Sequence, residues 1–342
     1  GSTMYLLYTD DSILAGPDQA EIDQIVRDLK KAGRDITEEG DIQDFLGVRI
    51  DRKADGSVHL TQPHLIESIL RDLKMLDRTK PKDTPACSSK LLSRHSDSAS
   101  FDKSFDYRSV IGKIGYLEKA SRSDLAYISH QCARFSADPK EEHGRAIRWL
   151  GRYLFGTKDK GTILRPSKEK QDLEVYVDAD FAGNWDAKEA AHDRDTARSR
   201  HGYLIMYAGC PILWKSQLQT EIALSSTESE YTGLSYALRD AIPIMQLIKE
   251  MKAHGFPIKN VTPKVHCKVF EDNSGAIEIA NVHKYRPRTK HLNVKLHHFR
   301  DYVTRKEISI HHIGTDDQLA DYLTKPLSVD RLRKLRKLVL GW

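Results

Sequence analysis

Residues 173–180 read LEVYVDAD, a predicted β-strand that closes on acidic side chains. Asp178 ends this strand, and three further acids stand at or near the ends of other predicted elements. Glu230 opens the long helix around SSTESEY, Asp272 follows the strand VHCKVF, and Asp321 lies in the short helix of QLADYLTK. Acids that come from distant parts of one α/β domain can converge on a common point.

Such a convergence predicts a metal site. A cluster of carboxylates repels itself unless divalent cations neutralise it. Ligands that are all oxygen suit Mg²⁺ or Mn²⁺. Two such ions about 4 Å apart can activate a water molecule and stabilise the leaving oxygen during phosphodiester cleavage. The four acids therefore predict a two-metal nuclease site.

Each acid also has a purely structural explanation. Asp178 can simply end a strand, and Asp272 can cap a helix. Glu230 can complete a capping box begun by Thr227, and Asp321 can lie on the surface of a short helix. One acid on each of four separate elements is nevertheless harder to explain in this way, so the metal site remains the leading hypothesis.

Length and composition fit a protein of two or three domains. The chain has 342 residues, of which 39% are hydrophobic and 30% are charged. No apolar run approaches the roughly 20 residues that span a bilayer, and no signal peptide is visible. We therefore expect no membrane partner. The four cysteines, which have no metal-ligand spacing, fit a reducing, intracellular compartment: Cys87, Cys132, Cys210 and Cys267.

Three regions are predicted along the chain. Residues 1–62 contain hairpin signals and a helix, residues 63–165 are mostly helical, and residues 171–342 form an α/β block. Gly, Pro, Ser and charged residues make 157–171 the best boundary. Strands of the α/β block are predicted near 173–179, 202–208, 211–215, 221–225, 265–270 and 307–312. Helices are predicted near 227–253, 273–282, 291–305, 316–324 and 328–339.

Residues 283–306 are densely basic, with eight lysines and arginines and a single acid. Basic helices are commonly solvated faces. A carboxylate cluster that cleaves phosphodiesters, however, needs a polyanionic substrate, which favours phosphate contacts. We predict that Lys290, Lys295 and Arg300 bind nucleic acid. Apolar residues at helical spacing in the same segment leave a packing role as the alternative.

Asp10 and Asp11 stand at the tip of a predicted hairpin, between YLLY and SILAG. Adjacent carboxylates at such a tip can bind the metal ions of nucleotidyl transfer. A solvated turn is the alternative, and a two-metal polymerase site needs a further acid on another strand.

Two histidines, His311 and His312, end the predicted strand that precedes the Asp321 helix. Either could enter the site as a proton shuttle, because imidazole exchanges protons near neutral pH. A packed or solvated histidine is the alternative.

The ordered motifs resemble the C-terminal part of a copia-type LTR retrotransposon Pol polyprotein, the end of reverse transcriptase followed by RNase H. YLLYTDDSILAG resembles the polymerase Tyr-x-Asp-Asp hairpin, and FLGVRI and HLTQPHLIESIL resemble the segment after it. YRSVIGKIGYLEKASRSDLAYISHQCARF and HGRAIRWLGRYLFGT resemble the thumb and connection region. VDADFAGN, GYLIMYAGCPILWKSQLQTEIALSSTESEY, EDNSGAI, RTKHLNVKLHHFRDYV and QLADYLTKPL resemble the RNase H block in order.

The resemblance implies a fold for each region. Residues 1–62 would be the C-terminal part of a reverse-transcriptase palm, and residues 63–165 a mostly helical thumb and connection. Residues 171–342 would be an RNase H-like α/β domain, a mixed sheet with flanking helices. SRSD at residues 121–124 stands where the family usually has Thr-Arg-Pro-Asp.

The resemblance also implies roles for individual residues. Asp10 and Asp11 match the paired polymerase ligands. Helical periodicity does not choose between Glu228 and Glu230, but the family pattern selects Glu230. The implied RNase H ligands for Mg²⁺ or Mn²⁺, which are also its catalytic residues, are Asp178, Glu230, Asp272 and Asp321.

The expected activity is therefore metal-dependent hydrolysis of the RNA strand of RNA–DNA hybrids. Expected partners are the hybrid itself and other segments or copies of the Pol polyprotein, in the cytoplasm, in a virus-like particle, or in the nucleus. The acid that precedes the hairpin in polymerases, and the fingers, have no counterpart here, so we expect no DNA polymerisation by this chain alone. The alternative is a catalytically inactive remnant that binds nucleic acid or acts as a scaffold.

Overall fold

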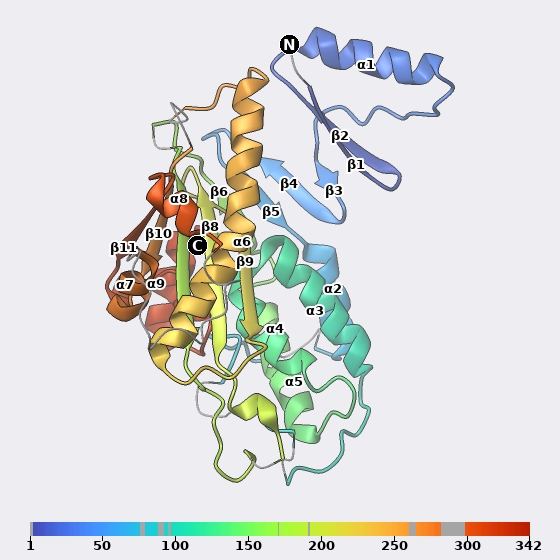
Figure 1. The fold of residues 1–342 in the computed structure, drawn as a ribbon. Helices are drawn as coiled ribbons and strands as arrows, with labels where there is room; N and C mark the ends of the chain where they lie inside the picture. Colours follow the sequence, from blue (N-terminus) through green and yellow to red (C-terminus); the bar gives the residue numbers. More distant parts are fainter. Residues whose placement is uncertain are drawn as a thin grey trace.

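A computed structural model describes residues 3–75, 79–87, 92–94, 97–169, 171–190, 192–259, 265–281 and 298–342. Its strands form three sheets of two, four and five strands. Figure 1 shows the smallest sheet at one end of the molecule, away from the five-stranded sheet.

The N-terminal hairpin lies on the surface. Strands β1 (Met4–Tyr8) and β2 (Asp11–Ala15) pair in antiparallel fashion, as predicted. Helix α1 (Gln19–Lys31) follows, and the Asp18 side chain caps it by accepting a hydrogen bond from the Ala20 backbone N–H at 2.9 Å. None of these elements contains a buried residue.

The helical region is inserted between two neighbouring strands of one sheet. The order of this four-stranded sheet is β3 (Asp44–Phe45), β4 (Val48–Arg52), β5 (Val58–Thr61) and β6 (Thr162–Leu164). Strand β6 lies within residues 157–171, so the predicted boundary carries a strand that returns to the N-terminal sheet. Gly161 permits this return, because a Cβ there would lie 1.9 Å from the carbonyl oxygen of Leu60.

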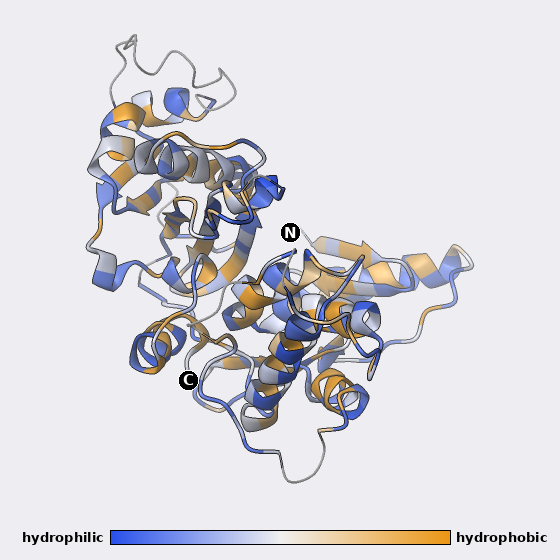
Figure 2. Ribbon diagram, turned by 90° about the horizontal axis from the view of Figure 1, so that it is seen from below, coloured by the Kyte–Doolittle hydropathy of each residue, from blue (hydrophilic) through white to orange (hydrophobic). Residues whose placement is uncertain are grey.

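Four helices of the inserted region share one apolar core. They are α2 (Pro63–Asp72), α3 (Tyr107–Ser121), α4 (Ala126–Ala133) and α5 (Glu141–Gly156). Their apolar residues recur every three or four positions, so each helix buries one face, including Ile66, Ile114 and Leu150. Figure 2 shows the resulting alternation of hydrophilic and hydrophobic residues along the helices.

Residues 171–342 contain a five-stranded mixed sheet. The order is β9 (Cys210–Leu218), β8 (Arg200–Tyr207), β7 (Leu173–Asp180), β10 (Cys267–Glu271) and β11 (Ile308–His312). Strands β7, β8 and β9 are antiparallel, whereas β10 is parallel to both β7 and β11. The β8–β9 turn places Ala208 and Gly209 at positive φ, as a tight hairpin requires.

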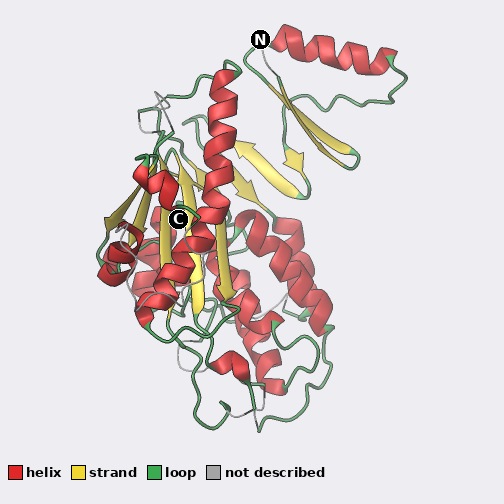
Figure 3. Ribbon diagram, in the orientation of Figure 1, coloured by secondary structure: helices red, strands yellow, loops and turns green. Residues whose placement is uncertain are grey.

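Helices cover both faces of this sheet (Figure 3). One face packs against α6 (Ser226–Ala253), α7 (Ser274–Asn281) and α8 (Arg300–Thr304), and the other against α9 (Val329–Leu340). Helix α6 carries an apolar stripe that is buried throughout: Tyr231, Leu234, Leu238, Ala241, Met245 and Ile248. The predicted α/β fold with a mixed sheet and flanking helices is confirmed.

Two predicted elements of this region need correction, and a third can be compared with the structure only in part. The strand predicted at 221–225 is wrong, because these residues form the loop that leads into α6. The helix predicted at 316–324 is two separate 3-10 turns, Thr315–Asp317 and Asp321–Leu323. For the helix predicted at 291–305, residues 291–297 lie outside the described residues.

No helix among the described residues combines the length and the apolar character that a bilayer crossing requires.

A hydrogen-bond network around a buried ion pair joins the helical region to the region of the five-stranded sheet. Arg122 and Asp124, both in the SRSD stretch, make two hydrogen bonds of 2.9 and 2.8 Å and are almost fully buried. The Tyr153 hydroxyl donates to Asp124 at 2.6 Å and accepts from Arg336 of α9 at 2.8 Å. The Trp342 ring lies over Arg336, with 3.9 Å from guanidinium carbon to ring centroid. The stretch is thus part of the interface between the two regions.

We predict that Asp124→Asn destabilises the protein by about 3–5 kcal/mol, because it leaves the buried Arg122 charge uncompensated. Urea denaturation measures this change. The control is Asp159→Asn, which removes an exposed carboxylate paired with Lys160 and should cost less than about 1 kcal/mol. Equal effects of the two substitutions would contradict the prediction.

Candidate metal centre

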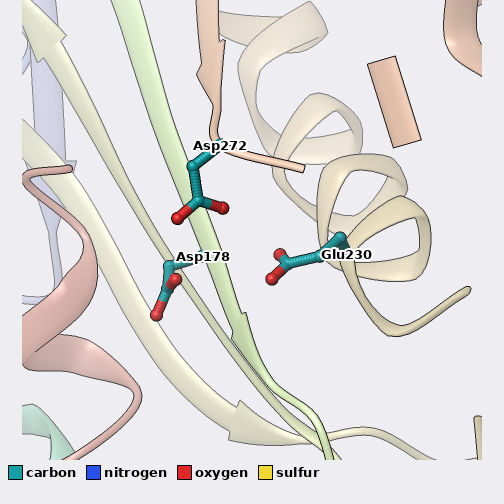
Figure 4. A group of neighbouring side chains, drawn as sticks. All are labelled: Asp178, Glu230 and Asp272. Atoms are coloured by element: carbon teal, nitrogen blue, oxygen red, sulfur yellow. The ribbon is translucent and has the colours of Figure 1, made fainter. Parts of the chain in front are cut away.

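Three acidic side chains converge at one edge of the five-stranded sheet. Asp178 stands near the end of β7, Asp272 directly follows β10, and Glu230 lies in the second turn of α6. One carboxylate oxygen from each lies within 4.8 Å of the others. Figure 4 shows the three side chains directed toward a shared space.

Strand pairing explains why two of these acids meet. Strands β7 and β10 are parallel, and Tyr176 is paired with Phe270. Two positions further along this register, Asp178 comes opposite Asp272. Because parallel strands end at the same edge of a sheet, both carboxylates emerge there.

The start of α6 explains which glutamate joins them. Ser225 caps the helix by accepting a hydrogen bond from the Glu228 backbone N–H at 3.1 Å. The Glu228 side chain in turn accepts from the Leu224 backbone N–H at 2.9 Å. Glu228 therefore belongs to the cap, and Glu230 is buried beside the two aspartates. The capping box proposed from Thr227 to Glu230 is wrong.

Burial makes it costly to ionise these acids together. Burial raises the pKa of Asp178 to about 6, although the Lys325 charge and a hydrogen bond from the Thr324 hydroxyl oppose the rise. Burial and the nearby carboxylate of Glu271 raise the pKa of Glu230 well above its ordinary range. A cation between these groups would remove the cost, because it stabilises every ionised carboxylate it touches.

Glu271, the last residue of β10, is an acid that the sequence interpretation missed. It is fully buried, and burial raises its pKa well above the ordinary range. The sequence contained a sign that Glu271 is buried, because the alternation of side chains along the strand puts it on the same face as Cys267 and Val269.

The donor set fits a divalent cation such as Mg²⁺ or Mn²⁺. Every candidate donor is a carboxylate oxygen, the type that these hard cations prefer. The Oε2 atoms of Glu230 and Glu271 are buried and have no hydrogen-bond partner among the described residues. A protonated carboxyl of one residue can donate to the other, and a cation would take the place of that proton when both carboxyls are ionised.

Asp321 lies beside the three-acid cluster, but its carboxylate is already paired. Lys325 Nζ lies 2.6 Å from Asp321 Oδ1, and Arg331 Nε lies 2.6 Å from Asp321 Oδ2. The Asp321 charge nevertheless reaches Asp178, whose pKa it helps to raise after the larger effect of burial. Of the four predicted ligands, three share one space and the fourth is held by two cations next to them.

The predicted polymerase pair is exposed at the hairpin tip. Asp10 lies in the turn and Asp11 begins β2. Among the described residues, no third acid, histidine or cysteine joins them in a metal-binding group. Their role as polymerase ligands stays a prediction.

The two candidate histidines lie at the end of β11. Both are exposed, and a hydrogen bond of 2.6 Å joins His311 Nε2 to Ser309 Oγ. His312 is paired in register with Glu271 of the neighbouring strand. Neither histidine belongs to the three-acid cluster among the described residues, and the proton-shuttle role stays a prediction.

Of the three predicted nucleic-acid contacts, only one can be placed. Lys290 and Lys295 lie outside the described residues. Arg300 is partly buried in α8 and donates from Nη2 to the carbonyl oxygen of Ile279 at 2.8 Å. This bond gives Arg300 a packing contact with α7, and its contact with nucleic acid stays a prediction.

Known proteins resemble this chain over almost its whole length. It is 30% identical over 340 residues to the retrovirus-related Pol polyprotein from transposon TNT 1-94 of Nicotiana tabacum, covering 98% of this chain and 24% of that protein. It is 31% identical over 328 residues to the Pol polyprotein from transposon RE2 of Arabidopsis thaliana, covering 96% and 21%. The chain thus spans less than a quarter of the length of these relatives.

Family models and solved structures add little to these sequence matches. No family model matches the chain. Among solved structures, the N-terminal RNase H domain of a Mycobacterium tuberculosis protein, fused to maltose-binding protein, aligns with a TM-score of 0.30 and 14% identity. That alignment covers 49% of this chain and 98% of the other.

The pKa of Asp178 predicts a pH dependence for the metal-free protein. Its ordinary value is 3.8, and the folded value is about 6. Between these values the folded protein holds a proton that the unfolded chain releases, so stability falls as pH rises. Relative to Asp178→Asn, which cannot ionise, the wild type should lose about 2 kcal/mol of unfolding free energy between about pH 4.5 and pH 7.

Urea denaturation of both proteins in EDTA measures this difference at each pH. Titrations of groups that do not interact with Asp178 cancel in the comparison, whereas the pKa values of Glu230 and Glu271, which the Asp178 charge helps to raise, fall in Asp178→Asn. The assigned pKa would be contradicted if the wild type did not lose unfolding free energy relative to Asp178→Asn as the pH rises.

Proposed function

This chain belongs to the copia-type retrotransposon Pol polyproteins, and we propose that residues 171–342 form an RNase H domain that hydrolyses the RNA strand of RNA–DNA hybrids. The observation that carries the proposal is the meeting of Asp178, Glu230 and Asp272 at one edge of a mixed sheet. The mixed sheet flanked by helices agrees with an RNase H-like domain.

The proposed ligands are held by hydroxyl groups from the loop that follows β11. Thr315 Oγ1 donates to Asp272 Oδ2 at 3.1 Å, and the Thr324 hydroxyl donates to Asp178 Oδ2. Each hydroxyl binds the Oδ2 atom of its aspartate, so the Oδ1 atom of the same carboxylate is not used by that bond. Divalent cations bound at the centre would polarise the scissile phosphate and lower the pKa of a water molecule.

Charge around the centre suits a polyanionic substrate. Lys325, Arg331 and Lys334 all lie on the segment that borders the acids, and each keeps part of its side chain exposed. Such cations offset the repulsion between carboxylates and a phosphate backbone. Selection of RNA over DNA would rest on contacts to the 2′-hydroxyl groups, which DNA lacks.

The second candidate function is non-catalytic binding of nucleic acid, or a scaffolding role. The observation that favours it is the pairing of Asp321 with two cations, which leaves three acids rather than four directed at a metal. A labelled RNA–DNA hybrid incubated with the purified protein separates the two functions. Cleavage with Mn²⁺ that EDTA abolishes supports the RNase H, and binding without cleavage supports the scaffold.

We predict that Asp272→Asn lowers hybrid cleavage by about 100-fold or more, because it removes a charged ligand from the centre. Hybrid binding and melting temperature should stay close to those of the wild type. The matched control is Asp330→Asn, an exposed acid in the first turn of α9, which should cleave normally. Wild-type cleavage by Asp272→Asn would rule out the proposed site.

For the N-terminal region, we propose that Asp10 and Asp11 do not support polymerisation in this chain alone. They form an exposed pair that no further acid joins among the described residues, whereas two-metal transfer requires a fuller ligand set. A primer-extension assay with the isolated chain should yield no product. Extension at ordinary protein concentration would overturn this expectation.

A further inference from the structure

Lys325 is the cation that stands among the carboxylates of the metal centre. Its Nζ lies 2.6 Å from Asp321 Oδ1, and its side chain is 40% exposed. Burial raises the pKa values of Asp178, Asp180 and Glu230, and the charge of Lys325 opposes this rise at all three. One ammonium group therefore compensates carboxylates from β7, α6 and the turn after β11.

The second cation bound to Asp321 is much more firmly anchored. Arg331 donates from Nε to Asp321, from Nη1 to Asp316 Oδ1 at 2.7 Å, and from Nη2 to the carbonyl oxygen of Thr315. Three acceptors fix its planar guanidinium. Lys325 pairs with Asp321 at the end of a flexible four-carbon chain and has no second ion pair among the described residues, so Lys325 is the partner that can leave.

We propose that the Lys325 ammonium is the resident counter-cation on the Asp178–Asp321 side of the centre, and that a divalent cation binding there must displace it. This inference rests on the metal centre of the proposed function. A first cation bound by Asp178, Glu230 and Asp272 would not need the Asp321 oxygen that Lys325 holds. A second cation, which would use Asp321, competes with Lys325 for the same oxygen.

The physical basis is that the oxygen Asp321 Oδ1 cannot bind the Lys325 ammonium group and a divalent ion at the same time without strong repulsion between them. An ammonium group and a divalent ion that share Asp321 Oδ1 would lie within a few ångströms of each other, where like charges repel strongly in a partly buried site. The ammonium must therefore withdraw into solvent, which its partial exposure allows.

Lys325→Met tests the proposal, because it removes the charge and keeps a side chain of similar length. Isothermal titration of the metal-free full chain with Mn²⁺, without nucleic acid, should show tighter binding at the weaker site by about tenfold or more. Lys325→Arg restores a cation and should lower that affinity again. The matched control is Lys334→Met, which removes a cation of the same segment that pairs with Asp317 and should leave the titration unchanged.

Thermal melting gives a second readout. In EDTA, Lys325→Met should melt below the wild type, because the carboxylates lose their counter-cation. Saturating Mn²⁺ should then raise its melting temperature by more than it raises that of the wild type. If Lys325 had only a packing role, Lys325→Met would lower the melting temperature equally in EDTA and in Mn²⁺. Its Mn²⁺ binding would then equal that of the wild type.

Identical Mn²⁺ titrations for wild type and Lys325→Met, including no binding in either, would overturn the proposal. Weaker binding by Lys325→Met would also overturn it. Failure of the RNase H proposal is a separate result, because it shows as absent hybrid cleavage by the wild type. Tighter Mn²⁺ binding by Lys325→Met without any cleavage would keep this inference and reject the nuclease.

Discussion

Repulsion between buried carboxylates is the constraint on which the C-terminal region depends. Asp178, Glu230 and Glu271 are each buried, and the pKa of each lies above its ordinary range because burial disfavours the charged form. Folding leaves these groups with few ways to lower their energy: protonation, a hydroxyl donor, or a cation. The residues around them supply the last two.

The segment after β11 supplies most of that compensation. Within residues 315–331 it provides two threonine hydroxyls, a lysine and an arginine, each bonded to an acid of the centre or to its neighbour Asp321. Arg331 ties this segment to α9, since it is the helix residue that reaches Asp321. The charge balance of the centre thus depends on a segment that adds no strand to the sheet but packs against it.

Helix α9 connects this balance to the rest of the molecule. Arg331 near its start binds Asp321, and Arg336, just over one turn later, donates to Tyr153 of the helical region. Tyr153 in turn donates to Asp124 of the buried ion pair. Helix α9 thus contacts both the acids at the sheet edge and the interface with the inserted helices. Both regions therefore constrain where Asp321 and its cations lie.

The sequence alone determined the elements and most of the candidate acids. Periodicity located the five strands and the buried stripe of α6, because apolar spacing reflects which face is buried. Residues 221–225 were mistaken for a strand, since a short apolar run does not reveal whether a neighbouring strand is there to pair with it. The same alternation that placed Val269 inside also marked Glu271, but an acid at a buried position was not expected.

Tertiary structure decided which charges meet. Only the pairing of β7 with β10 brings Asp178 opposite Asp272, and only the cap at Ser225 turns Glu230 rather than Glu228 toward them. The pairing of Asp321 with Arg331 also follows from the packing of α9, whereas Lys325 lies only four residues from Asp321 along the chain. Sequence spacing fixes how residues are ordered along one element. The distance between charges on separate elements depends on how those elements pack, and electrostatic energy depends on that distance.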